Sequence, residues 1–264
     1  MSDAIHRLVL LVERLRRECP WDREQTFATV QTFLLEEAHE VLEAVDREAP
    51  DQLLGELGDL LFQVLFLSRL AQERGWFGIE EVAASIERKM IERHPHVFGP
   101  EKASDASQVK ANWEKKKREG RNPPGDPLGS VPKALPALSA ALRMSERAAD
   151  LGFEWERDSD LLAKVEEEIG EARRESEVGN RAGTEEELGD LLFALVNWAR
   201  RGRIDPERAL RLANEKFRRR FHRVAEIARA EGRDVSKFSA GELDGFWNRV
   251  KEEEKASSRK PGTP

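Results

Sequence analysis

Apolar residues recur along the chain at the spacing of amphipathic helices. They occupy positions 8, 11, 12 and 15, which share one face of a helix that we expect to end near Cys19–Pro20. Three further helices are predicted over residues 26–45, 51–75 and 79–94. Sustained alternation of polar and apolar residues is missing from the sequence, so no strand is predicted. The pattern therefore predicts an all-α protein.

A proline- and glycine-rich segment interrupts this helical pattern near the middle of the chain. Residues 118–136 read REGRNPPGDPLGSVPKALP, and such a stretch cannot continue a helix. The helical pattern then resumes and runs almost to the end of the chain. We therefore predict an N-terminal domain (1–117), a linker (118–136), a C-terminal domain (137–252) and a disordered tail (253–264).

The two predicted domains repeat the same acidic residues. ELGDLLF occurs at residues 56–62 and again at 187–193, an offset of 131, and three glutamates precede it in each half at the same offset. The matched carboxylates are Glu36, Glu37, Glu40, Glu56 and Asp59 in the first half, and Glu167, Glu168, Glu171, Glu187 and Asp190 in the second. The residues between the glutamates and ELGDLLF are almost unrelated in the two halves. Selective retention of the acids indicates a tandem duplication with a functional constraint.

The spacing of these acids predicts that they converge. Glu37 and Glu40 share a helical face, as do Glu56 and Asp59 on the next helix, and a short connection would make the two helices antiparallel neighbours. Two like charges about 4 Å apart repel by about 4 kcal/mol at an effective dielectric near 20. The surrounding leucine and phenylalanine runs predict burial, which adds to the cost. An all-oxygen donor set favours a hard divalent cation such as Mg²⁺.

The acidic residues admit two other interpretations. Acidic residues on glutamate-rich helices most often form a solvated face, but the duplicated spacing argues against that here. A di-iron bundle needs Glu-x-x-His twice, and the chain supplies it once, at Glu36 and His39, whereas the matched pair is Glu167 and Gly170. A site for a divalent cation is therefore favoured over a solvated face and over iron.

Cations and tryptophans are also repeated. Lys89 and Arg93 match Lys216 and Arg220, and each pair places two cations on one helical face. Such pairs are either surface charges or ligands for phosphate oxygens that a metal does not reach.

Each half also carries a tryptophan with a lysine four residues later. Trp113 precedes Lys117, and Trp247 precedes Lys251. Most tryptophans of this kind are core anchors, but an aromatic plane beside a cation would suit a base or ribose next to a phosphate. The sequence contains no glycine-rich P-loop or GxGxxG motif that would bind a nucleotide by either common route.

The composition of the chain excludes several classes of function and partner. The formal net charge is −7, which argues against a sequence-blind nucleic-acid binder. Cys19 is the one cysteine of the chain, so no intrachain disulfide can form. Neither a secretory leader nor an uninterrupted apolar run of membrane-spanning length is present, so we expect a cytoplasmic protein with no membrane partner.

Together these motifs resemble one protein family. The stretches that carry the likeness span nearly the whole chain: CPWDREQT, LLEEAHEV, ELGDLLFQV, KMIERHPHVFG, GSVPKALPAL, LGFEW, ELGDLLFALVN and NEKFRRRF. They resemble the MazG-type nucleoside triphosphate pyrophosphohydrolases. The resemblance implies tandem helical bundles of the all-α NTP pyrophosphatase type, Mg²⁺ dependence, a homodimer, and hydrolysis of NTPs or dNTPs to the monophosphate and pyrophosphate.

The resemblance also assigns roles to residues. It implies metal ligation by Glu37, Glu40, Glu56, Asp59, Glu168, Glu171, Glu187 and Asp190, and orientation or activation of water by Glu36 and Glu167. It implies nucleotide contacts from Glu168, Lys216, Arg220, Trp247 and Lys251, with Lys89, Arg93, Trp113 and Lys117 as their first-half equivalents. Neither half lacks a ligand, and the second half, which adds Asn214, is the favoured site of turnover.

Two rival functions stay open from the sequence. The chain could be a non-catalytic helical protein that senses nucleotides or binds partners, which pyrophosphate release from dATP and Mg²⁺ would distinguish. It could also act on a histidine-pathway or dUTP substrate, although such relatives tend to be single-unit chains.

Overall fold

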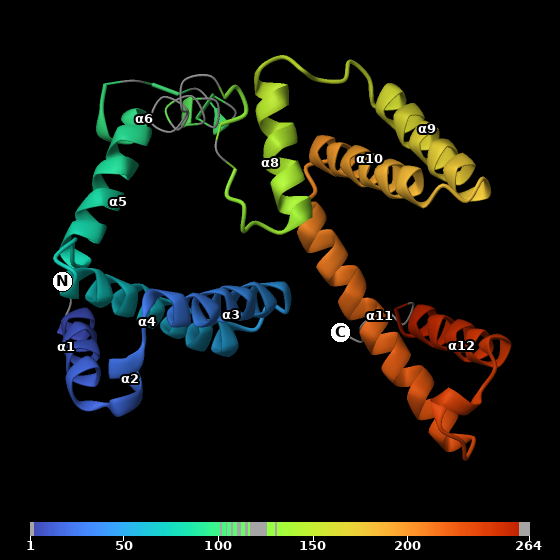
Figure 1. The fold of residues 1–264 in the computed structure, drawn as a ribbon, viewed down its shortest axis with the longest axis horizontal. Coiled ribbons are helices and arrows are strands. Elements are labelled where there is room, and N and C mark those ends of the chain that lie inside the picture. The colour runs from blue at the N-terminus through green and yellow to red at the C-terminus, as the bar shows by residue number, and fades with distance from the viewer. Residues whose placement is uncertain are drawn as a thin grey trace, which may run out of the picture. The chain divides into compact units, whose positions relative to one another are not determined.

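The computed structural model consists of two compact units, Met1–Arg121 and Asn122–Pro264 (Figure 1). It describes residues 3–258 except 101, 104, 107, 110, 111, 114, 115, 117–125 and 130. The described residues are helical and contain no β-strand, which confirms the predicted all-α fold. Across these same residues, no helix is long and apolar enough to cross a membrane. The border between the units falls within the predicted linker, while the finer domain limits stay a prediction.

The first unit is organised around a pair of long antiparallel helices. α3 and α4 lie side by side, and α1 packs against α4 (Figure 1). The helices with described bounds in this unit are α1 (Asp3–Glu18), α2 (Pro20–Glu24), α3 (Phe27–Asp46), α4 (Pro50–Glu73), α5 (Ile79–Arg93) and α6 (Pro95–Phe98). The α3–α4 pair carries all the predicted acidic ligands of the first half, so this pairing determines their geometry.

Local sequence signals explain where α3 and α4 begin and end. Thr26 caps α3 with a capping box: its hydroxyl accepts from the Thr29 amide at 3.3 Å, and the Thr29 hydroxyl accepts from the Thr26 amide at 2.8 Å. Pro50 occupies the first turn of α4, where its missing N–H is not needed. Gly75 follows the end of α4 with φ of 68°, a left-handed conformation that glycine adopts without strain.

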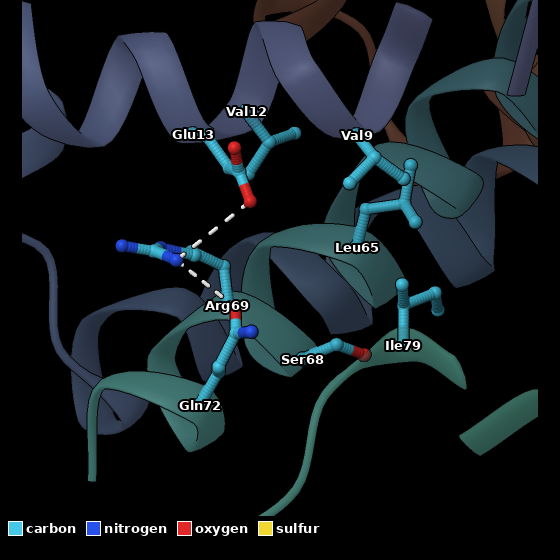
Figure 2. Close-up of a pocket in the computed structure, with 8 residues that line it drawn as sticks. All are labelled: Val9, Val12, Glu13, Leu65, Ser68, Arg69, Gln72 and Ile79. Carbon is cyan, nitrogen blue, oxygen red and sulfur yellow. Dashed lines mark hydrogen bonds and ion pairs between the residues drawn. The ribbon is translucent and has the colours of Figure 1, made fainter. Parts of the chain in front are cut away.

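The core of the first unit lies between α1, α3 and α4. Val12, Val30, Leu65, Phe66 and Leu70 are buried together there. Beside this core is a cavity of about 20 Å³, room for about one water molecule, lined partly by Ser68 and Gln72 (Figure 2). Its rim carries Arg69, which contacts Glu13 at 3.8 Å and Gln72 at 2.9 Å. The cavity is part of the scaffold and none of the predicted ligands lines it.

The second unit repeats the long helix pair. α9 and α10 pack closely together, α8 packs on α10, and α12 packs against α11 (Figure 1). The helices are α8 (Ala137–Asp150), α9 (Asp158–Glu177), α10 (Arg181–Arg201), α11 (Pro206–Ala230), the 3₁₀ helix η1 (Val235–Lys237) and α12 (Ala240–Ser258). Leu161 on α9 and Val196 on α10 are fully buried. Val224, Ile227 and Val250 form a separate core between α11 and α12.

Two features differ from the sequence predictions. α12 continues to Ser258, past the predicted domain end at residue 252, so residues 253–258 are helical. The apolar runs around ELGD are buried only in part. Leu65 and Phe66 are buried, whereas Leu57, Asp59, Leu188 and Asp190 are all exposed. The prediction of buried surroundings is therefore wrong for these residues, because α4 and α10 each bury one face only.

Candidate metal and nucleotide sites

The α3–α4 pair brings the predicted ligands of the first half together. One carboxylate oxygen each from Glu37, Glu56 and Asp59 lies within 4.8 Å of the others. Glu40 lies close enough to both Glu37 and Glu56 to affect their ionisation. We call these four residues the first acidic cluster; its members come from consecutive helices, two from each, as the i, i+3 spacing predicts.

The α9–α10 pair builds a matching second acidic cluster from Glu168, Glu171, Glu187 and Asp190. One oxygen each from Glu168, Glu171 and Glu187 lies within 4.8 Å of the others, and Asp190 is close enough to Glu187 to affect its ionisation. Both clusters therefore gather four carboxylates between the two helices of a pair, although the sequence between the motifs is almost unrelated in the two halves.

The carboxylates of each cluster destabilise one another when ionised. Burial, followed by repulsion from Asp59 and Glu40, raises the pKa of Glu37 above its ordinary value. The pKa of Glu56 is raised by burial and, to a smaller extent, by repulsion from Glu40 and Asp59. The pKa of Glu187 is likewise raised by burial and then by repulsion from Glu171 and Glu168. A bound cation would relieve this repulsion.

The donor set fits a hard divalent cation. All donors are carboxylate oxygens, the ligands that Mg²⁺ and Ca²⁺ prefer. Glu168 is only 4% exposed, and its Oε2 has no hydrogen-bond donor among the described residues. A buried carboxylate oxygen without a partner is costly, and a cation would satisfy it.

The structure adds partners of the ligands that the sequence did not single out. Lys164 lies 2.7 Å from Glu168, and Arg174 lies 3.1 Å from Glu171. The hydrogen bonds to Glu168 and Glu167 raise the pKa of Lys164. In the first unit, the amide of Gln63 on α4 bonds to the Glu37 carboxylate. The i, i+4 spacing of Lys164 and Glu168 could have identified the lysine, whereas no sequence signal pairs Gln63 with Glu37.

The predicted water-orienting glutamates lie at the margin of the clusters. Glu36 and Glu167 are exposed, each next to the most buried ligand of its cluster. Glu167 accepts a hydrogen bond from Lys164 at 3.0 Å. Their roles stay a prediction.

Each predicted tryptophan contacts an arginine, a pairing that was not predicted from the sequence. The Arg93 guanidinium lies 5.2 Å from the centre of the Trp113 ring, and that of Arg220 lies 5.8 Å from the Trp247 ring. Arg220 also bonds to Glu254 at 2.8 Å. Lys117 lies outside the described residues. Both halves thus pair an arginine with the predicted tryptophan.

The remaining predicted nucleotide contacts do not reach the carboxylates. Lys216 is exposed on α11, Lys251 is half-buried on α12, and Lys89 is half-buried on α5. In the part of the chain that the structure describes, no hydrogen bond or ion pair joins these three lysines, or the two arginine–tryptophan pairs, to an acidic cluster. Each unit therefore presents an acidic group and a basic–aromatic group on different helices.

Comparison with known proteins agrees with this duplicated arrangement. The model of the MazG nucleotide pyrophosphohydrolase domain matches residues 25–98 and 157–225, which contain the two acidic clusters. The chain is 44% identical over 257 residues to the nucleoside triphosphate pyrophosphohydrolase of Escherichia coli K12, covering 95% of this chain and 98% of that protein.

It is also 39% identical over 249 residues to the nucleoside triphosphate pyrophosphohydrolase/pyrophosphatase MazG of Thermotoga maritima, covering 92% of this chain and 94% of that protein. A crystal structure of a MazG-related protein from Thermotoga maritima matches 43% of this chain and 98% of its own, with 29% identity and a TM-score of 0.38.

The all-α fold, the twice-matched domain and the named relatives define an all-α hydrolase with a repeated domain. The chain belongs to the MazG nucleotide pyrophosphohydrolase family.

Proposed function

We propose that the chain hydrolyses nucleoside triphosphates, NTPs or dNTPs, to the monophosphate and pyrophosphate in a Mg²⁺-dependent reaction, and so removes unwanted nucleotides from the pool. The observation that carries this proposal is the convergence of carboxylate oxygens within 4.8 Å in both repeats. The names of the relatives from Escherichia coli and Thermotoga maritima support the substrate class.

The acidic clusters would hold the cation. Glu37, Glu40, Glu56 and Asp59 would bind it in the first unit, and Glu168, Glu171, Glu187 and Asp190 in the second. Mg²⁺ bound there would act as a Lewis acid and neutralise charge on the phosphate oxygens.

The other residues of the chain would carry the remaining steps. Glu167, and Glu36 in the first unit, would orient the attacking water and accept its proton. The water oxygen forms the new bond to the α-phosphorus, and the bond from that phosphorus to the bridging oxygen breaks and releases pyrophosphate. Lys216 and Arg220 would balance the charge of the leaving group, and Trp247 would contact the base or ribose.

Part of the proposal concerns the assembly. We propose a homodimer and a cytoplasmic location, as the family resemblance implies.

Pyrophosphate and dAMP release from dATP and Mg²⁺ tests the activity. We expect release by the wild-type chain, reduced release by Asp190→Asn or Asp59→Asn, and none by the double variant. Asp150→Asn is the matched control, since Asp150 is exposed at the end of α8. Full activity of the double variant would refute the site assignment. Binding of dATP by the wild type without any pyrophosphate would support the nucleotide-sensing alternative.

A further inference from the structure

The two acidic clusters differ in the groups that contact their most buried ligand. In the second unit, the Lys164 ammonium lies 2.7 Å from Oε1 of Glu168 and 3.0 Å from Oε1 of Glu167. The position matched to Lys164 in the first repeat is Phe33, which packs edge-on against Trp21 with ring centres 5.8 Å apart. A cation in one repeat therefore replaces an aromatic ring in the other.

A second difference lies on the facing helix. Gln63 on α4 bonds to the Glu37 carboxylate, whereas the matched residue on α10 is Ala194, which has no polar side chain. Glu168 consequently has a cation on Oε1 and no donor on Oε2. In the first cluster a neutral amide contacts the half-buried Glu37, whereas in the second a charged neighbour on the same helix contacts the buried Glu168.

This ion pair is shielded from solvent on one side. The Glu168 side chain is 5% exposed and that of Lys164 is 34% exposed. Charges in such surroundings interact more strongly than at the surface, because water screens them less. A divalent cation that binds Glu168 has to overcome repulsion from Lys164 or displace it. Arg174 also contacts a ligand, Glu171, but its side chain is 65% exposed and its effect is screened.

We propose that Lys164 is a built-in counter-ion that lowers the affinity of the second acidic cluster for free divalent cations. The two repeats then bind the cation at different concentrations. The first cluster fills first, because no lysine or arginine among the described residues forms an ion pair with its ligands. Lys164 is a positioning residue in this proposal, since it acts through Glu168. The inference rests on the proposed role of the clusters as divalent-cation sites.

Calorimetric titration of the metal-free full-length chain with Mn²⁺ tests the inference. The measurement uses a background in which Glu56→Gln and Asp59→Asn disable the first cluster. In that background, Lys164→Met is expected to tighten Mn²⁺ binding by roughly tenfold, which corresponds to about 1.4 kcal/mol. Lys164→Gln should do the same, and Lys164→Arg should restore the weak binding.

Lys255→Met serves as the matched control. Lys255 is exposed on α12 and pairs with Glu252, so its loss changes the net charge equally without touching the cluster. Mn²⁺ affinity that is unchanged or weaker in Lys164→Met, or that shifts equally in Lys255→Met, would overturn the role of Lys164 while leaving the cation site intact. Absence of Mn²⁺ binding by both clusters in the wild-type chain would overturn the inference together with the proposed function.

Discussion

Arg200 and Glu154 form a two-bonded ion pair that joins the end of α10 to the segment before α9. The two guanidinium nitrogens lie 2.5 and 2.6 Å from the two carboxylate oxygens. Arg200 also donates to the Ser145 hydroxyl on α8 at 2.7 Å, and that hydroxyl donates to Asn197 at 2.6 Å. This network joins α8, α10 and the segment that leads into α9, so it supports the helix pair that carries the second acidic cluster.

The first prediction concerns the acid stability of this network. The hydrogen bonds from Arg200 lower the pKa of Glu154 from 4.5 to about 2. Because the pKa is lower in the folded state, the carboxylate stabilises the fold above about pH 4.5, and this contribution is lost as the pH falls toward 2. Glu154→Gln should therefore lower stability at neutral pH and flatten its decline between these values.

Urea unfolding at several pH values measures this effect. We expect a loss on the order of 1 kcal/mol at pH 7, since the pair is partly exposed and screened. Asp158→Asn is a matched control, because Asp158 pairs with Arg201 but its side chain is 72% exposed. An equal loss of unfolding free energy in both variants would show that the partly buried Arg200–Glu154 pair stabilises the fold no more than an exposed pair does.

The second prediction concerns cation-linked stability. Mg²⁺ that binds only the folded clusters should stabilise the chain, by roughly 2.7 kcal/mol at a concentration 100 times the Kd. Thermal unfolding with Mg²⁺ and with a chelator measures the difference. The combined variant Asp59→Asn and Asp190→Asn should be more stable than the wild type without metal, because repulsion is relieved, and should gain less from Mg²⁺. A full Mg²⁺ response in that variant would place the binding elsewhere.

The third prediction concerns the core of the first unit. Phe66 is 2% exposed and packs with Val12, Val30 and Leu70. Phe66→Ala should cost about 3–5 kcal/mol in the free energy of unfolding, because it removes buried contacts and leaves a cavity. Leu54→Ala, on the same helix at a site that is 76% exposed, should change it by less than about 0.5 kcal/mol. Denaturant unfolding compares the two.

The fourth prediction concerns nucleotide contact. If Lys216 contributes a charge-assisted hydrogen bond to the triphosphate, Lys216→Met should raise the KM for dATP by roughly tenfold or more. Lys216 is exposed on α11, so the helical circular dichroism spectrum should not change. Lys237→Met is the control, because it removes the same positive charge from η1, away from the proposed nucleotide contacts, and should leave the KM unchanged. An unchanged KM would remove Lys216 from the nucleotide site.

The helices and the acidic clusters were largely predictable from the sequence. α3 begins at Phe27 and α5 ends at Arg93, each within one residue of the prediction, because Thr26 and Pro95 are strong local signals. The convergence of Glu37 with Glu56 follows from i, i+3 spacing and a short connection. These features depend on neighbours in sequence, so periodicity is enough to predict them.

Other features depend on contacts between distant residues. The pairing of Gln63 with Glu37 and the burial of Glu168 require the exact rotation of one helix against another, which periodicity does not specify. The exposure of Leu57 and Leu188 shows the same limit, since an apolar run does not reveal which of its faces is covered. The short helix α2 also escaped prediction, because five residues are too few to show a period.

The close spacing of the ligands along the chain has a consequence for folding. All the members of the second acidic cluster lie within residues 168–190, on two helices joined by a tight connection. Contacts between near neighbours in sequence form early, because little chain entropy opposes them. Like charges thus meet while the hairpin closes, before the rest of the unit has gathered around it. The concentration of divalent ions would therefore affect the folding rate of each repeat as well as its stability once folded.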